Sequence, residues 1–243
     1  MGQTQRSPLA AETLARLGEV STATVTMQLL KRGLRNVYMR GPKPFRPEQP
    51  RLVGEAYTLR FIPMREDLSR VEVLGEPDYA PRKVIEATPP GQILVIDARG
   101  ERAAGTVGDI LVARLKERGV AGIVTDGAVR DGADVAAIDF PIFCTGTAAP
   151  ASLNLHFGAD HDCPIGCGGV AVLPGDVIVG DGDGVVVVPR ALADEIAADG
   201  FEQELLESFL KSRIEAGHPV IGTYPPNEET RRAYEAWRRA REG

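Results

Sequence analysis

The middle of the chain alternates short apolar runs of strand length with longer segments whose apolar side chains recur at helical spacing. In chain order these segments are 93–96, 107–118, 122–124, 134–138 and 140–144. Gly119 ends the first helical segment, as glycine commonly does. Strands joined by helices pack as parallel neighbours, with the helices covering the faces of the sheet. The pattern therefore predicts an α/β fold for this part of the chain.

The next part of the chain is rich in strand signals instead. Three apolar runs, 170–173, 177–179 and 185–188, are separated by turns of glycine and aspartate. The sequence Gly-Asp-Gly-Asp-Gly at 180–184 resembles part of a calcium-binding loop, but Leu192 stands where such a loop has its bidentate glutamate. We therefore interpret residues 180–184 as a hairpin turn.

Helical segments flank this region towards both ends of the chain. Ser21 is a typical N-cap for a helix, and a much longer helix is predicted over 190–216. A terminal helix is predicted over 227–241, and its only large apolar side chains are those of Tyr234 and Trp237. So few apolar residues cannot stabilise an isolated helix, so this helix must dock on the rest of the protein or fray.

The composition, with 43% hydrophobic and 26% charged residues in 243, is that of a globular protein. We predict one domain over 1–243, with a core at about 21–216 and a helical extension at about 226–243. No apolar run approaches the roughly 18–20 residues of a membrane span, and the polar first residues do not resemble a secretory signal. Three cysteines are too few for a disulfide framework. A cytoplasmic location is therefore expected.

The charge distribution bears on possible partners. A net charge of −6 disfavours general attraction to nucleic acid. Between residues 31 and 51, however, seven lysines and arginines accompany a single acid, Glu48. Because prolines interrupt this stretch, we interpret it as a solvated loop or a subunit contact. Binding of an anionic ligand or RNA is the alternative.

Two other motifs have weaker functional interpretations. His156, His161, Cys163 and Cys167 lie within twelve residues, and such side chains bind zinc. Their spacing matches no common structural zinc pattern, so buried thiols and loop histidines are the preferred interpretation. The glycines of 166–171 precede a strand rather than a helix, which argues against a dinucleotide-binding turn.

The segments that carry chemistry lie at 105–109 and 125–134, where two predicted strands pass into helices. The carboxyl ends of neighbouring parallel strands are where α/β folds bind ligands, so the two turns can meet at one pocket. The helix that begins near Gly108 offers free backbone N–H groups and the positive end of its dipole to an anion. A carboxylate substrate would suit this position.

Three charged side chains of these turns define a candidate site. Arg130 is suited to a bidentate contact with a carboxylate, and Asp109 and Asp131 supply hard oxygen ligands of the kind that Mg²⁺ or Mn²⁺ binds. Alternatively, the two aspartates cap helices and Arg130 makes a surface salt bridge. Spacing alone gives the two interpretations equal weight.

These residues resemble the motifs of the RraA-like family, which includes regulators of ribonuclease E activity and class II 4-hydroxy-4-methyl-2-oxoglutarate / 4-carboxy-4-hydroxy-2-oxoadipate aldolases. The matching segments are 108–111, 118–119, 126–131, 164–166, 174–176 and 180–185. The resemblance covers roughly residues 21–216. It implies a compact α/β/β/α fold of the swivelling-domain type, here with N-terminal helices and a long C-terminal helix. It also implies homotrimers or hexamers with active sites at subunit interfaces.

The resemblance implies a role for each candidate side chain. Asp131 would bind a divalent cation, Mg²⁺ or Mn²⁺, Asp109 would hold metal-bound water, and Arg130 would bind the substrate and stabilise an enolate. A glutamate from the C-terminal helix of a neighbouring subunit would assist catalysis. Glu204 and Glu207 are both candidates for that glutamate, and we assign Glu207 as the catalytic one.

The backbone at Gly108, Ile110 and Leu111 would bind the carboxylate of the pyruvyl group. The implied reaction is the metal-dependent cleavage of a 4-hydroxy-2-oxo dicarboxylic acid to pyruvate and a second oxo acid, with oxaloacetate decarboxylation as a side activity. Since Arg130, Asp131 and Asp134 form a complete set, the aldolases are favoured over the regulators. The alternative is a non-catalytic regulator that binds an RNA-processing enzyme such as ribonuclease E.

Overall fold

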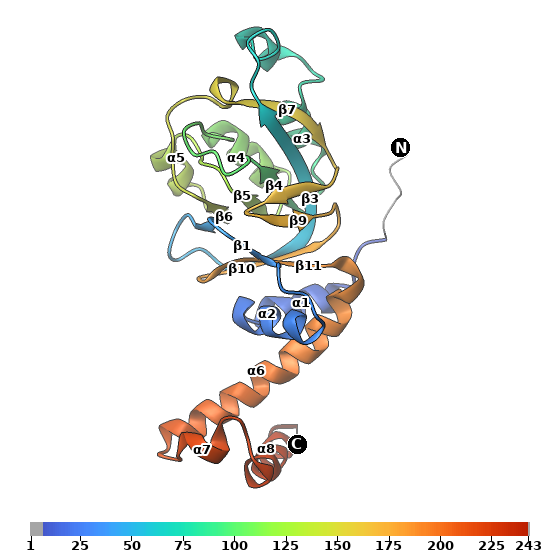
Figure 1. The fold of residues 1–243 in the computed structure, drawn as a ribbon, viewed down its shortest axis with the longest axis vertical. Coiled ribbons are helices and arrows are strands. Elements are labelled where there is room, and N and C mark those ends of the chain that lie inside the picture. The colour runs from blue at the N-terminus through green and yellow to red at the C-terminus, as the bar shows by residue number, and fades with distance from the viewer. Residues whose placement is uncertain (1–6, 243) are drawn as a thin grey trace.

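The computed structural model describes residues 7–242, and it has four layers in the order α/β/β/α (Figure 1). The helices are α1 (Ala11–Glu19), α2 (Thr22–Lys31), α3 (Ala80–Ala87), α4 (Asp109–Glu117), α5 (Gly132–Ala137), α6 (Ala193–Glu215), α7 (Val220–Thr223) and α8 (Glu228–Glu242). The strands are β1 (Tyr38–Met39), β2 (Lys43–Pro44), β3 (Leu52–Pro63), β4 (Ile93–Asp97), β5 (Gly122–Thr125), β6 (Ile142–Cys144), β7 (His156–His161), β8 (Ile165–Cys167), β9 (Val170–Val172), β10 (Val177–Asp181) and β11 (Gly184–Val188). Short 3-10 helices are η1 (Val71–Gly75), η2 (Ser152–Asn154) and η3 (Arg190–Leu192).

The main sheet runs in the order β1-β11-β10-β3-β4-β5-β6-β2, and β7 pairs with β3. Strands β3, β4, β5 and β6 are parallel neighbours, whereas β10 and β11 form an antiparallel hairpin. The predicted α/β alternation in the middle of the chain and the predicted hairpin turn at 180–184 are both confirmed. The hairpin also stabilises the start of α2, because Asp181 Oδ2 accepts a hydrogen bond from the backbone N–H of Thr22 at 2.8 Å.

Both faces of the central strands are buried, which explains why they read as continuous apolar runs. On β4, Leu94 and Ile96 pack beneath α3, α4 and α5, while Ile93 and Val95 face the second β layer. A third cluster joins β10 and β11 to α1, α2 and α6. Each fully buried side chain of this size contributes roughly 1.5–3 kcal/mol, so the three clusters hold the layers together.

The C-terminal helices α6, α7 and α8 form an arm that extends away from α4 and α5, at the lower end of the molecule in Figure 1. Helix α6 begins against α1 and α2, and its 23 residues span about 35 Å, so its second half extends beyond the layered body. Helix α8 docks on this half, since Phe209 lies 5.6 Å from Tyr234 and 5.5 Å from Trp237 between ring centroids. Arg238 adds an ion pair with Glu202. The predicted terminal helix therefore docks rather than frays.

Two predictions of local structure need correction. Strand β7 was expected as loop, because Gly158 and the polar residues around it weaken the strand signal, but it pairs antiparallel with β3. The helix predicted at 134–138 begins two residues earlier, directly after Asp131. Ser21 caps α2 as predicted, accepting a hydrogen bond from Thr24 N at 3.1 Å. Among residues 7–242, every helix falls short of the length and apolar character that a membrane crossing requires.

Candidate functional site

The two strand-to-helix turns meet at one hollow of about 180 Å³. It is lined by Leu74, Tyr79, Pro81, Arg82, residues 105–111, Arg130, Asp131, Ala151 and Ser152. Every predicted site residue of the two turns, from Gly108 to Leu111 and at 130–131, therefore lies at the same hollow. Its volume is below the ~300–1,000 Å³ of pockets for drug-sized ligands, so it suits a small metabolite.

Backbone hydrogen bonds fix the two turns against each other. Thr106 N donates to Ala128 O and Arg130 N donates to Val107 O, both at 2.8 Å. Asp126, which is buried at the end of β5, holds the preceding loop by accepting from Ala98 N at 2.7 Å and Gly100 N at 3.0 Å. The backbone under the site is thus tied to the parallel strands rather than free to move.

Two glycines allow the close approach of the turns. A Cβ at Gly105 would overlap the Cγ of Arg130 and lie 2.8 Å from its backbone nitrogen. A Cβ at Gly108 would lie 2.5 Å from Asp131 Oδ2. Both distances are shorter than any real contact of a Cβ, so the absence of side chains at these positions places Arg130 and Asp131 over the first turn of α4.

Asp131 lies in the left-handed region, with φ 55° and ψ 44°, directly before α5. Aspartate tolerates this conformation better than most residues do. Its side chain makes no capping hydrogen bond to α5. The carboxylate, which adjoins Gly108, is therefore directed to the hollow, and the interpretation of Asp131 as a helix cap is wrong.

The Arg130 side chain makes no ion pair with any of residues 7–242, and its Nε atom is buried without a hydrogen-bond partner. The alternative of a surface salt bridge is therefore wrong as well. A half-buried guanidinium without a counter-ion favours binding an anion, because pairing recovers part of its desolvation cost.

The amino-terminus of α4 faces the same hollow. Gly108 is the N-cap, and it offers no side chain to the backbone N–H groups of the first turn. Residues 109–111 line the hollow, and Ile110 is 75% exposed. Free N–H groups and the helix dipole together favour a negative group at this position.

One wall of the hollow was missed by the sequence reasoning. Leu74 of η1 and Tyr79, Pro81 and Arg82 around the start of α3 come from a charged stretch, 65–82, in which Gly75, Pro77 and Pro81 predict mostly loop and helix entry. Burial raises the pKa of the Tyr79 hydroxyl, and the nearby Ser152 and Arg82 oppose the rise. Tyr79 therefore remains protonated at neutral pH. The proline at the helix start was the only local signal for this wall.

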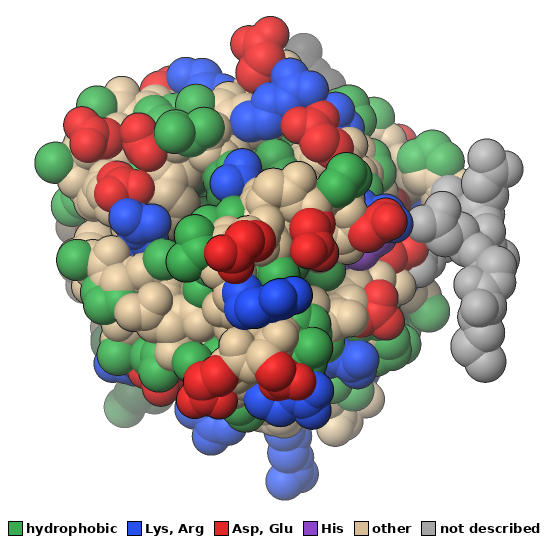
Figure 2. All heavy atoms as spheres, turned by 90° about the horizontal axis from the view of Figure 1, so that it is seen from above, with side chains coloured by type: hydrophobic (Ala, Val, Ile, Leu, Met, Phe, Trp, Pro, Cys, Tyr) green, Lys and Arg blue, Asp and Glu red, His purple; other side chains and the backbone are tan. Residues whose placement is uncertain are grey.

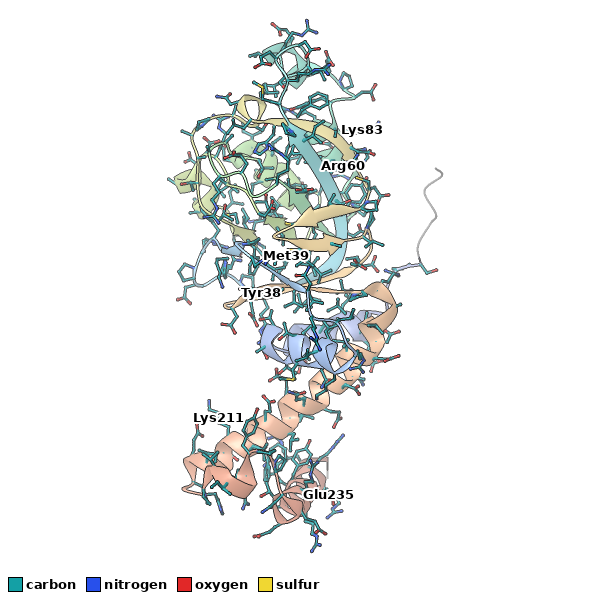
Figure 3. All side chains as sticks on the ribbon, in the orientation of Figure 1. Tyr38, Met39, Arg60, Lys83, Lys211 and Glu235 are labelled. Carbon is teal, nitrogen blue, oxygen red and sulfur yellow. The ribbon has the colours of Figure 1, made fainter. Side chains whose placement is uncertain are left out.

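The two candidate glutamates lie on α6, away from the hollow of their own chain. Glu204 accepts a hydrogen bond from Ser21 N at 2.9 Å. Burial by itself raises the pKa of Glu204, but hydrogen bonds with Ser21 and Thr24 outweigh it, so the pKa lies below its ordinary value. Among the described residues, Glu207 accepts a hydrogen bond only from Gln203 on the same helix, at 2.7 Å. Figure 3 shows that Lys211, one turn further along α6, is at the opposite end of the molecule from Lys83 of α3.

The donor set at the hollow suits a hard cation with few protein ligands. Asp109 and Asp131 both line it, and no group of three or more His, Cys, Asp or Glu side chains that could hold a metal occurs in residues 7–242. Two carboxylates fit Mg²⁺, which usually keeps several waters and is held by one or two carboxylates.

The same search gives no support to a zinc site. His156 packs on Phe61 with ring centroids 4.9 Å apart, and Nδ1 of His161 lies 3.0 Å from the Tyr57 hydroxyl. Burial raises the pKa of the Cys167 thiol well above its ordinary value, which disfavours the thiolate that zinc binds. The two histidines lie on β7 rather than in a loop, Cys167 is buried and Cys163 is half-buried.

Part of the basic stretch at 31–51 is engaged by other groups within the described residues. Arg32 pairs with Asp199 at 2.5 Å, Arg46 with Asp139 at 3.0 Å, and the Lys43 amine donates to the backbone of Asp183. On the face of the molecule in Figure 2, acidic and basic side chains are interspersed rather than gathered by sign. Neither observation points to a nucleic-acid surface.

The fold and the hollow define an α/β protein with a small hollow at the carboxyl ends of its parallel strands, lined by Arg130 and by the free amino-terminus of α4. Comparison with known proteins gives the family. The RraA-like profile (Aldolase/RraA) matches residues 19–187, and the chain belongs to this family.

Three relatives illustrate the range of the family. A Halalkalibacterium halodurans protein named "Putative 4-hydroxy-4-methyl-2-oxoglutarate aldolase" is 41% identical over 126 residues, which are 52% of this chain and 60% of that protein. Streptomyces coelicolor RraAS2, described as an unusual member of the RNase ES inhibitor RraA protein family, shares 38% identity with a TM-score of 0.77. That match covers 85% of this chain and 98% of the other. An uncharacterised protein of Pseudomonas syringae pv. tomato shares 26% identity with a TM-score of 0.78, over 90% of this chain and 100% of the other.

The matched region is thus less than two thirds of the aldolase-named relative, and the family profile ends before α6. The comparisons support the swivelling-type α/β fold with its long C-terminal helix. One relative is named as an aldolase and another as a member of an RNase inhibitor family. The choice between these two functions for this chain therefore depends on the residues of its own site.

Proposed function

We propose that this protein is a divalent-metal-dependent lyase that cleaves a 4-hydroxy-2-oxo dicarboxylic acid to pyruvate and a second oxo acid. The observation that carries the proposal is the convergence of Arg130, Asp109, Asp131 and the amino-terminus of α4 on one small hollow. A regulator that only binds another protein has no need of an unpaired guanidinium beside two carboxylates in a concave site. The aldolase-named relative supports the same assignment.

The residues of the hollow divide the work of binding and charge stabilisation. The 1-carboxylate of the substrate accepts hydrogen bonds from the backbone N–H groups of residues 109–111, for which Gly108 leaves room. Arg130 donates to the 2-oxo oxygen. When the bond between C3 and C4 breaks, its electron pair moves onto the pyruvyl part, and the negative charge that grows on the oxygen faces the guanidinium. Stabilisation therefore increases towards the transition state.

Asp131 would hold Mg²⁺ or Mn²⁺ directly, and Asp109 would hold a water of that cation. When bound, the cation supplies Lewis-acid chemistry to the 2-oxo group. Removal of the proton from the 4-hydroxyl is assigned to Glu207 of a neighbouring subunit, because Glu204 is engaged by Ser21 within its own chain. The same pyruvyl binding site would accept oxaloacetate, so decarboxylation of oxaloacetate is part of the proposal.

This assignment requires a second subunit, for which we propose a homotrimer or hexamer, since Lys211, one turn beyond Glu207 on α6, lies far from the part of the chain that forms the hollow (Figure 3). The exposed apolar residues on the arm, Val220 at 59% and Ile221 at 91%, are consistent with a subunit contact. Mixing tests this directly. Arg130→Ala and Glu207→Gln oligomers, each inactive alone, should regain activity after dissociation and reassembly together. Activity in pure Glu207→Gln, or none after mixing, would contradict the shared site.

The decisive test of the function is pyruvate release from 4-hydroxy-4-methyl-2-oxoglutarate, followed with and without added metal. Chelation should abolish turnover, and Mg²⁺ or Mn²⁺ should restore it. Titration with Mn²⁺ gives an independent readout: Asp131→Asn should lose binding, whereas Asp139→Asn, at an exposed carboxylate that pairs with Arg46, should not. Turnover that survives full chelation would reject metal dependence.

A second function is favoured by the relative described as a member of the RNase ES inhibitor family. In that case the chain would bind an RNA-processing enzyme such as ribonuclease E. Adding the purified protein to a ribonuclease E cleavage assay distinguishes the two. Inhibition that persists in Arg130→Ala, without pyruvate release by the wild type, would replace the lyase by the regulator.

A further inference from the structure

A second arginine, Arg82, lines the hollow, and the proposed chemistry at Arg130 does not use it. Arg82 belongs to α3, on the wall that the η1 to α3 segment builds, whereas Arg130 follows β5. Within residues 7–242, the Arg82 side chain makes no hydrogen bond or ion pair. The half-buried Arg130 and the exposed Arg82 therefore line one hollow of about 180 Å³, and neither side chain has an ion pair within the described residues.

The neighbouring cations of the same surface behave differently. Lys83 pairs with Asp78 at 3.4 Å, and Arg114 of α4 binds both oxygens of Glu86 at 2.9 and 2.8 Å. Arg82 thus lacks a partner although adjacent cations have one. Like charges facing one cavity repel each other, so the arrangement becomes favourable when an anion with two separated negative groups enters.

The wall that carries Arg82 is held in place by packing. Pro81 sits against Gly158 of β7, where any Cβ would overlap the proline ring. Tyr79 packs with Val73 and Leu153 in a small buried cluster. Arg82 is therefore presented from a fixed helix start rather than from a mobile loop, which makes it suitable for recognition.

We propose that Arg82 binds the distal carboxylate of the substrate and makes the site selective for dianionic 2-oxo acids. This inference rests on the proposed function, in which the other carboxylate lies at the amino-terminus of α4 beside Arg130. A guanidinium forms two parallel hydrogen bonds with a carboxylate, and such charged bonds discriminate strongly against ligands that lack the group. Leu74 and Pro81 make part of the same wall apolar, and the other polar side chains near it, Tyr79 and Ser152, carry neutral hydroxyl groups rather than a charge.

The first test compares two substrates on three variants. Arg82→Gln should lower kcat/KM for 4-hydroxy-4-methyl-2-oxoglutarate by about 10–100-fold, mainly through KM, as loss of a hydrogen bond to a charged group does. For 4-hydroxy-2-oxopentanoate, which has one carboxylate, it should change kcat/KM by less than about 3-fold, within the scatter of such values. Arg82→Lys should recover part of the loss, and Lys83→Gln is the matched control that should leave both substrates unchanged. Equal losses on both substrates, or no loss on either, would overturn the proposal.

The second test uses binding, so that it remains informative if turnover is absent. Calorimetric titration with Mg²⁺ present compares 2-oxoglutarate, a dianion, with 2-oxobutanoate, a monoanion. Wild type should prefer the dianion by at least about 10-fold, and Arg82→Gln should remove that preference without weakening 2-oxobutanoate. Failure of both ligands to bind wild type would reject the proposed function and Arg82 with it. Binding of both with equal affinity would reject the role of Arg82 alone.

Discussion

The hollow and the C-terminal arm are built on different principles. At the hollow, backbone hydrogen bonds between two turns and the missing side chains of Gly105 and Gly108 leave one arrangement for Arg130 and Asp131. On the arm, α8 is held to α6 by contacts of the Phe209 ring with Tyr234 and Trp237 and by the exposed ion pair of Arg238 with Glu202. The comparison teaches that the proposed chemistry depends on closely packed backbone, whereas the arm is a weakly held element whose position can respond to a partner.

The largest expected effect is at the guanidinium of the hollow. Arg130→Ala should lower kcat for pyruvate release by about 100–1,000-fold, the loss that follows removal of one donor to a developing oxyanion. Arg114→Ala on α4 is the control, because its pair with Glu86 is exposed and contributes at most about 1 kcal/mol. Circular dichroism should show an unchanged fold for both. Near-normal turnover by Arg130→Ala would reassign the site.

The next effect tests the close packing itself. Gly105→Ala places a methyl group on the Arg130 side chain, and a displacement of about 1 Å can cost about 100-fold in rate. Gly18→Ala is the matched exchange, since a Cβ there has nothing within 4 Å. Steady-state kinetics of the two variants make the comparison. Full activity in Gly105→Ala would mean that the turns are not as closely constrained as described.

A smaller effect is expected on the arm. Trp237→Ala removes ring contacts with Phe209 and Tyr234 and should destabilise docking of α8 by about 1–2 kcal/mol, less than the ~3–5 kcal/mol of a fully buried tryptophan. Hydrogen exchange should accelerate in residues 228–242 and stay unchanged in β4 and β5. Acceleration throughout the body would contradict the separation between arm and body.

The smallest effect is a pH dependence of the body. Burial and, secondarily, Arg99 lower the pKa of His156, which is fully buried on β7. The unfolded chain therefore takes up a proton, below about pH 6.5, that the folded chain does not, so the free energy of unfolding decreases as pH falls. The slope is at most about 1.4 kcal/mol per pH unit. Urea unfolding between pH 7 and 5 should show this decrease in wild type and a shallower one in His156→Gln, with His218→Gln on the arm as control. Identical slopes in wild type and His156→Gln would contradict it.

Much of the site could be predicted because its residues are close in sequence to strand ends. Parallel strands β4 and β5 carry their turns to the same edge, so Asp109 and Arg130 had to be neighbours. The sequence could not decide whether Asp131 caps a helix or binds a ligand. The left-handed backbone conformation that directs its side chain leaves no periodic pattern in the sequence.

The rest of the site depends on contacts between distant segments. Arg82 reaches the hollow because Pro81 packs on Gly158. These two residues are far apart in the sequence, and Gly158 belongs to β7, a strand that has no clear sequence pattern. Glu207 could be placed on a helix but not relative to any hollow, since helical spacing says nothing about a neighbouring subunit. Local patterns thus predicted the turns, and tertiary packing supplied their wall.

The most direct test of the central claim is a crystal structure with oxalate, a mimic of the pyruvate enolate, and Mg²⁺. The account predicts oxalate in the hollow, with one carboxylate at the N–H groups of residues 109–111, Arg130 on an oxygen of the other, and the cation beside Asp131. Oxalate bound elsewhere, or a hollow that stays empty at saturating oxalate and Mg²⁺, would contradict it.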